Sequence, residues 1–348
     1  MKGRIFVVDH TFMENVNDKM EIKAKLPPIS GSRLFGSLTS IIADMYQLQL
    51  GDYVFLWETK GNNPDSYIWG VYRIISNPFF DYDEPEYIKA KIELAYSFKN
   101  PITEYDILND PYNKIDLWNI VGKKVADKSR ASTPLSPYET EFLIQKLINE
   151  NPDYKFYNRK TKKVKINNEI KINYNKYENK EITNYSSLKF NNISYINKNG
   201  TVKYEKFMEL LFNMIIRDSN KSALSKININ IDNIFWYANY LPYSIDKSEI
   251  DYLIMESSDN TNIDKINLLE FQRDKLNEDH INKALLYSKW INSKLAKGSN
   301  LTRPIIICEK FADLETIILE REKFYGTKPL EIYTINLKNG IINIEKRR

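Results

Sequence analysis

Two apolar stretches separated by a polar turn constrain the second half of this chain more than any other feature. Residues 249–255 (EIDYLIM) and 266–272 (INLLEFQ) have the length and the branched and aromatic content of buried strands. A helical period follows at residues 278–295, and another apolar strand at 303–308. These segments therefore predict the order strand, strand, helix and strand.

Two carboxylates stand where these strands would meet. Asp251 lies at the start of the first strand and Glu270 near the end of the second, so a hairpin brings them together. Gln272 points the same way as Glu270, because side chains alternate along a strand. Two carboxylates suit a magnesium ion that keeps waters for its substrate. The pair therefore predicts a magnesium site, the alternative being a solvated strand end with a salt bridge.

This stretch resembles the PD-(D/E)XK nucleases, in which an acidic residue on one strand precedes Glu-x-Lys on its neighbour. The resemblance covers roughly residues 203–340. It implies hydrolysis of phosphodiester bonds with magnesium held by Asp251 and Glu270, because a bound metal activates water and stabilises charge on a phosphate.

The chain departs from the family at the lysine, where it has Gln272. Lysine places a positive charge near the attacking water, whereas glutamine can only orient that water by hydrogen bonding. Three alternatives follow. Gln272 orients the water, or Lys275 or Lys283 reaches in, or the site is inactive.

Residues flanking the hairpin complete the expected nuclease site. Residues 201–217 have an apolar helical face, and in the family such a helix often carries a further acidic residue. Glu205 and Glu209 are one turn apart on the same side of it, and Glu209 is the expected catalytic contributor. Arg273 and Lys275 are expected to contact the DNA backbone.

Composition excludes several classes of site and location. The single cysteine, Cys308, rules out an intrachain disulfide framework, and two histidines are too few for a histidine-rich metal site. No apolar run approaches the ~20 residues that span a bilayer, and the first residues do not have the pattern of a signal peptide. We therefore expect a cytoplasmic protein. The net charge of +4 permits nucleic-acid binding without requiring it.

The sequence of the first half of the chain predicts short strands and a hairpin. Residues 51–55 (GDYVF), 69–73 (WGVYR) and 77–81 (NPFFD) together resemble the PUA-like domains of the EVE and YTH type. That resemblance implies a small barrel that holds a flipped-out modified base among aromatic side chains, where stacking and edge hydrogen bonds recognise it. The candidates for this base-binding role are Trp57, Trp69, Tyr46 and Tyr53, and core packing is the alternative for each ring.

A basic segment lies between the strands of the first half and the helix that follows them. Lys123, Lys124, Lys128 and Arg130 are interleaved with a glycine and hydroxyl residues, a composition that suits contact with DNA phosphates or an ordinary solvated loop. Residues 136–139 (SPYE) then predict a helix start with a serine cap, proline at the first position and a capping box.

Together these features predict an α/β (α+β) protein of two domains. Residues 1–152 form the PUA-like recognition domain, residues 153–200 a connector with a possible hairpin, and residues 201–348 the nuclease domain. The expected function is a magnesium-dependent restriction endonuclease that recognises modified or flipped bases, acts on DNA and works as a homodimer with no membrane partner. The alternatives are a non-catalytic nucleic-acid binding protein with a decayed nuclease fold, or an RNA-binding PUA-like protein.

Overall fold

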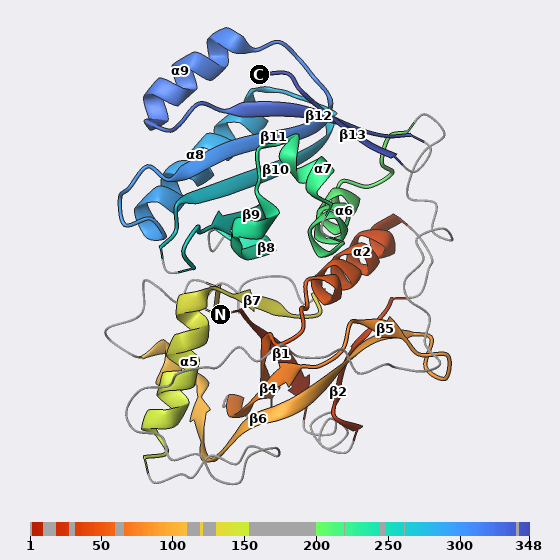
Figure 1. Ribbon diagram of the computed structural model, residues 1–348, viewed down its shortest axis with the longest axis vertical. Helices are drawn as coiled ribbons and strands as arrows, with labels where there is room; N and C mark the ends of the chain where they lie inside the picture. Colours follow the sequence, from red (N-terminus) through yellow and green to blue (C-terminus); the bar gives the residue numbers. More distant parts are fainter. Residues whose placement is uncertain are drawn as a thin grey trace. The chain divides into compact units, whose positions relative to one another are not determined.

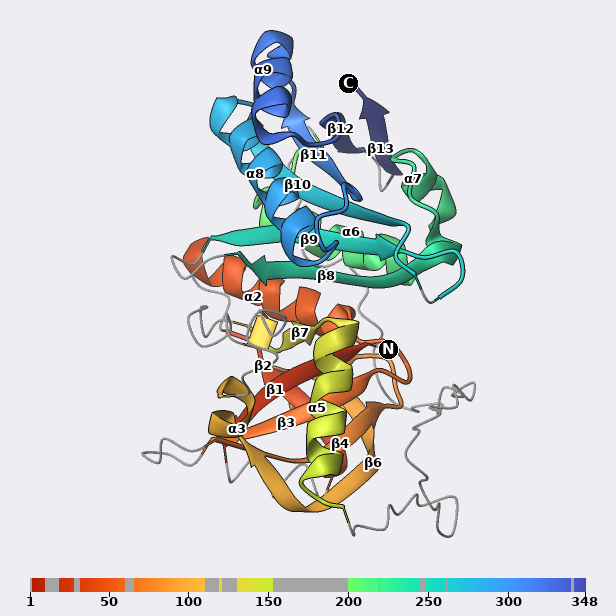
Figure 2. The same ribbon diagram turned by 90° about the vertical axis from the view of Figure 1, so that its left-hand side faces the viewer.

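The chain forms two compact units, each with its own mixed sheet and helices (Figures 1 and 2). The computed structural model describes residues 2–9, 19–27, 32–59, 66–109, 119–120, 130–152, 200–218, 220–243, 248–260, 262–338 and 341–348. The first unit holds the described residues up to 152 except 32–43, and the second holds 32–43 and those from 200 onward. The predicted α+β class is therefore confirmed. The predicted connector and its hairpin fall on residues 153–199, outside the described residues.

A seven-stranded sheet organises the first unit. Its order is β2 (Glu21–Lys25), β6 (Tyr87–Thr103), β4 (Ser66–Ile74), β3 (Tyr53–Thr59), β1 (Gly3–Asp9) and β7 (Thr133–Leu135), with β5 (Phe79–Phe80) also paired to β6. The predicted β3–β4 hairpin is antiparallel, as expected, while β1 and β3 run parallel. The long strand β6 pairs first with β2 and then with β4 through two register shifts. Such irregularities bend a strand, and the sheet curls into a half-barrel (Figure 2).

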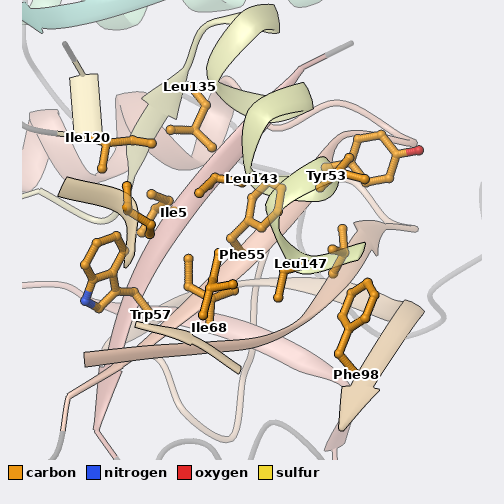
Figure 3. Packing of buried hydrophobic residues seen from close by; sticks show 14 residues of the cluster. Ile5, Tyr53, Phe55, Trp57, Ile68, Phe98, Ile120, Leu135, Leu143 and Leu147 are labelled. Carbon is orange, nitrogen blue, oxygen red and sulfur yellow. The ribbon is translucent and has the colours of Figure 1, made fainter. Parts of the chain in front are cut away.

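Helix α5 (Pro137–Asn149) closes the core of the first unit (Figure 3). The predicted capping box is present, because Ser136 accepts the Glu139 amide and the Glu139 carboxylate accepts the Ser136 amide. Leu143 and Leu147 of this helix pack against the sheet, in one cluster with Phe55 of β3. Helix α3 (Glu104–Leu108) is shorter than α5, and helix α2 (Ser32–Tyr46) is divided between the units, with residues 32–43 in the second.

Close contact between α5 and β1 depends on a glycine. A Cβ at Gly3 would lie 2.5 Å from Thr140 Oγ1. Only glycine therefore lets the helix lie this near the strand.

A six-stranded sheet organises the second unit. Its order is β13 (Ile341–Lys346), β12 (Glu331–Lys338), β11 (Thr302–Lys310), β10 (Lys265–Lys275), β9 (Glu249–Glu256) and β8 (Ile234–Pro242). Strands β10, β11 and β12 run parallel to one another, whereas β8 and β9 form an antiparallel meander with β10. The predicted succession of strand, strand, helix and strand is present as β9, β10, α8 (Glu278–Lys294) and β11.

Helices cover both faces of this sheet. Helix α6 (Lys206–Arg217) packs on one face, where the ring centroids of Phe212 and of Phe271 on β10 lie 5.0 Å apart. Helices α8 and α9 (Glu315–Tyr325) pack on the other, around Ile306 and Ile332 (Figure 2). Glu270 is paired with Ile306 in the ladder, so it points toward the face that α8 covers.

Three features of the second half lie outside the sequence predictions. Residues 234–242 form one continuous strand, β8, and Pro242 is accommodated because β8 is an edge strand. Helix α9 has a weak apolar periodicity, and Ile318 is its one buried position. Strand β13 follows β12 and forms the edge of the sheet.

Across the described segments, no helix combines the length and the apolar character that crossing a bilayer demands.

Candidate functional site

The β9–β10 hairpin brings the two predicted carboxylates together. The Asp251 Oδ2 atom accepts a hydrogen bond of 2.9 Å from the amide of Phe271, and the Asp251 amide lies 3.3 Å from Glu270 Oε1. Pairing of Leu269 with Tyr252 puts Glu270 opposite Asp251 in the antiparallel ladder. The Glu270 side chain is fully buried, and that of Asp251 is mostly so.

A lysine from helix α8 completes the cluster. The Lys283 ammonium nitrogen lies 2.7 Å from Glu270 Oε2 and 3.7 Å from Asp251 Oδ1. Of the two lysines, Lys275 and Lys283, that the sequence offered as partners of the carboxylates, the structure brings Lys283 to them. Lys275 is exposed near the C-terminal end of β10. Gln272 is buried in the strand position expected for it, two residues after Glu270.

The pKa values of Glu270 and Lys283 are both raised in this cluster. Burial raises the pKa of Glu270, the neighbouring Asp251 raises it further, and Lys283 offsets part of the effect. Burial would lower the pKa of Lys283, but Asp251 and Glu270 outweigh burial and raise it, so the ammonium stays charged. Proton affinities displaced in this way are typical of functional sites, although structural ion pairs also produce them.

Glu205, immediately before α6, is the acidic residue that interacts with this cluster, where Glu209 was expected. Glu205 precedes α6, accepts from the Arg273 amide at 3.3 Å, and has a pKa raised by burial and by Asp251. Glu209 is buried and instead accepts a 2.7 Å hydrogen bond from Asn239 of β8. The sequence placed both on one side of a helix, but α6 starts at residue 206, so Glu205 stands at the helix end.

A cavity of about 690 Å³ opens beside Asp251. Its charged lining residues are Lys283, Lys206 of α6 and three carboxylates, and its lining also includes three tyrosines: Asp251, Glu249, Asp279, Tyr240, Tyr243 and Tyr287. Sequence reasoning missed Lys206 and Tyr287. Helical spacing does place Tyr287 one turn after Lys283, and this was the available signal. The volume falls within the range of about 300–1,000 Å³ usual for ligand pockets.

The donor set suits magnesium. Asp251 and Glu270 provide hard carboxylate oxygens, and magnesium is usually held by one or two carboxylates while it retains waters. The Lys283 ammonium lies against both carboxylates, so an ion held here would share them with this charge. Among the residues that the structure describes, no group of three or more histidine, cysteine or acidic side chains forms a metal site, so any ion here would depend on waters for its other ligands.

The basic residues that sequence assigned to the DNA backbone lie in different settings. Lys123, Lys124 and Lys128 fall outside the described residues. Arg130 forms an ion pair with the buried Asp44, with its Nε 2.9 Å from Oδ2, which corrects its assignment as a phosphate contact. Arg273 is part-exposed and donates to the Lys203 carbonyl at 2.8 Å.

Two of the four rings proposed for base binding are core residues. Tyr53 and Trp57 pack in the cluster under α5, because the face of β3 that they share with Phe55 points into the core (Figure 3). Their assignment to an open pocket is therefore corrected. Trp69 is half-buried, and its indole N–H donates to Glu58 at 2.8 Å. Tyr46 is half-buried at the end of α2.

Comparisons with known proteins add low-similarity matches only. No family model matches the chain, and no curated protein matches it. Among solved structures, a hypothetical protein from Leishmania major matches with 9% identity and a TM-score of 0.32, covering 43% of this chain and 96% of its own.

Two further structures are complexes with modified nucleic acids. Human THYN1 in complex with 5-methylcytosine-containing DNA matches at 9% identity and TM-score 0.27, over 42% of this chain and 96% of its own. The YTH domain of Zygosaccharomyces rouxii MRB1 in complex with N6-methyladenosine RNA matches at 13% identity and a TM-score of 0.26, over 41% of this chain and 85% of its own. Matches this distant carry no weight for the function of this chain.

Proposed function

We propose that this chain is a magnesium-dependent DNA endonuclease whose hydrolytic site is built by Asp251, Glu270 and Lys283. One observation carries the proposal. Two carboxylates and an ammonium, from β9, β10 and α8, meet within 3.7 Å beside a cavity. The order α6, β8, β9, β10, α8 and β11 also agrees with the resemblance to PD-(D/E)XK nucleases.

Each residue has a role suited to its position. Asp251 and Glu270 would hold magnesium, which when bound supplies stabilisation of charge on the phosphate and a more acidic water. Lys283 keeps its proton, so it supplies the positive charge near the attacking water that the family takes from a strand lysine. Gln272 would hydrogen-bond that water, and Glu205 adds negative charge beside Asp251.

The first unit would select the DNA. Its sequence resemblance to PUA-like domains supports recognition of a modified or flipped base. Trp69, which is half-buried, and the neighbouring Tyr67, with ring centroids 6.1 Å apart, are the rings best placed to contact one. Cutting both strands needs two hydrolytic sites, so the proposal includes a homodimer or dimerisation on DNA. In a cell this arrangement would suit restriction of modified foreign DNA.

A plasmid-cleavage assay tests the hydrolytic site. We expect the wild type to cut modified plasmid DNA with magnesium and not with EDTA, and Asp251→Asn to lose at least 100-fold in rate. The matched control is Asp232→Asn, since Asp232 is an exposed carboxylate of the same unit that pairs with Lys221. Equal cleavage by wild type and Asp251→Asn would contradict the proposal.

A non-catalytic nucleic-acid binding protein is the second candidate. The observation that favours it is the Lys283 ammonium, which already forms ion pairs with Glu270 and Asp251. This candidate predicts DNA binding by wild type and Asp251→Asn alike, with no cleavage by either. A binding competition between modified DNA, unmodified DNA and RNA separates it from an RNA-binding role.

A further inference from the structure

The wall of the cavity beside Asp251 is aromatic and carries charges of both signs, with Lys206 and Lys283 lining it alongside Asp251, Glu249 and Asp279. Tyr243 packs against Tyr287 with ring centroids 4.5 Å apart and against Trp290 at 5.5 Å. The Lys206 ammonium lies 3.4 Å from the centre of the Tyr240 ring. Lys283 stands 5.5 Å from the centre of the Tyr287 ring, so the cavity and the carboxylate cluster share a wall.

The backbone at Tyr240 is held in an unusual conformation. Its φ of 58° lies in the left-handed region, which is rare for a residue with a bulky side chain. Tyr240 stands between the ladder pairs Asn239–Tyr252 and Leu241–Ile250, and therefore opposite Asp251. Strain of this kind collects at binding sites, where surrounding contacts maintain it. Here it accompanies a ring that lines the cavity next to the carboxylates.

These groups match the parts of a nucleotide. Aromatic faces stack on bases, and ammonium groups bind phosphate. Bases inside a duplex are covered on both faces by neighbouring base pairs, so the ring of Tyr243 can stack only on a base that has left the helical stack.

We propose that this cavity is a subsite for the base of one unpaired nucleotide beside the scissile phosphate of DNA. The half-buried Tyr243, whose ring packs on the buried Tyr287, provides the stacking face. The Lys206 ammonium, which lies over the Tyr240 ring, binds the adjoining phosphate. The inference rests on the proposed nuclease function and adds to it a preference for single-stranded or locally opened DNA at the cut.

Binding of the full chain to labelled DNA tests the subsite without cleavage. Fluorescence anisotropy in EDTA compares a single strand with the blunt duplex of the same sequence. We expect Tyr243→Ala to weaken binding of the single strand about tenfold and to leave duplex binding unchanged, because stacking contributes to the former alone. Tyr243→Phe keeps the ring and should restore single-strand binding.

Two matched controls separate the subsite from general effects. Phe324→Ala removes an aromatic side chain on α9 that is 71% exposed, and should leave both affinities as in the wild type. Lys206→Met should weaken single-strand binding, whereas Lys221→Met, which removes an exposed lysine paired with Asp232, should not. Circular dichroism establishes that each variant is folded.

The outcomes distinguish this inference from the nuclease proposal. Unchanged single-strand binding by Tyr243→Ala, or equal loss on both DNA forms, overturns the subsite even if Asp251-dependent cleavage is found. A selective loss supports the subsite even if the wild type cuts no DNA, which would overturn the nuclease proposal alone. Tighter binding of the matching RNA strand, also lost in Tyr243→Ala, would overturn the assignment to DNA.

Discussion

The ammonium of Lys283 on helix α8 lies 2.7 Å from Glu270 Oε2 on strand β10, inside a site where the Glu270 side chain is fully buried. Because helix α8 follows strand β10 along the chain, the proposed site would take from the neighbouring layer the charge that PD-(D/E)XK nucleases take from a strand lysine. The ion pair therefore joins the sheet to its covering helix and also defines the candidate site.

Loss of Lys283 should destabilise the protein in a pH-dependent way. Burial and Asp251 raise the pKa of Glu270, and removing Lys283 raises it further. When the pKa of a carboxyl group is higher in the folded than in the unfolded state, the folded protein becomes less stable as the pH rises above the usual pKa of 4.5. We expect Lys283→Met to cost about 2 kcal/mol at pH 8 and much less at pH 5, measured by urea denaturation.

A double variant provides the control for that prediction. Glu270→Gln removes the buried charge, so Glu270→Gln combined with Lys283→Met should recover most of the stability lost at pH 8. If Lys283→Met lost the same amount of unfolding free energy at pH 5 and at pH 8, the role given to the ion pair would be contradicted.

Glu331 of β12 should stabilise the second unit in neutral solution but not in acid. Burial would raise its pKa, but hydrogen bonds from Arg303, Tyr333 and Lys346 lower it to about 2. Its contribution is present above the usual value of 4.5 and is lost as the pH falls towards 2. We expect Glu331→Gln to cost about 3 kcal/mol at pH 7 and clearly less at pH 3, measured by chemical denaturation.

The control for Glu331 is a carboxylate on the neighbouring strand β13. Glu345 is 51% exposed and pairs with Arg347, so Glu345→Gln should change the unfolding free energy by less than about 0.5 kcal/mol. If the Glu331→Gln deficit persisted undiminished at pH 3, the ion pair with Arg303 would not be its cause.

Arg130 should act on stability and not on DNA affinity. It pairs with the fully buried Asp44, which also lies 3.9 Å from Arg4. We expect Arg130→Met to cost about 3 kcal/mol because it leaves a buried carboxylate short of a partner. The salt dependence of DNA binding should stay unchanged, whereas loss of a phosphate contact would reduce its slope by about one. A reduced slope in a folded variant would restore the assignment to the backbone.

Two tryptophans of the first unit should respond differently to truncation. Trp57 lies in the core, so Trp57→Leu should cost about 3 kcal/mol of stability, measured by thermal denaturation. Trp69 is half-buried, so Trp69→Leu should cost about 1 kcal/mol. If the first unit recognises modified bases, Trp69→Leu also weakens binding of modified DNA about tenfold. Equal binding by Trp69→Leu and the wild type would remove this ring from the site.

Local sequence was enough to predict the hairpin, the helix after it and the strand beyond. Alternation along 249–255 and 266–272, together with the apolar period of the following helix, specifies each element from near neighbours. The capping box at Ser136 and Glu139 was predictable for the same reason, because it depends on residues three apart. Asp251 and Glu270 could be paired because a hairpin leaves few registers open.

The packing of helices on the sheets decided which side chains face the core and which lysine reaches the carboxylates. Alternation puts Tyr53, Phe55 and Trp57 on one face of β3, but only the position of α5 shows that this face is the core. In the same way, the sequence placed a lysine on a helix, and the packing of that helix against β10 brought Lys283, and not Lys275, to the carboxylates. Long-range contacts of this kind depend on the crossing of helix and sheet, which local periodicity does not encode.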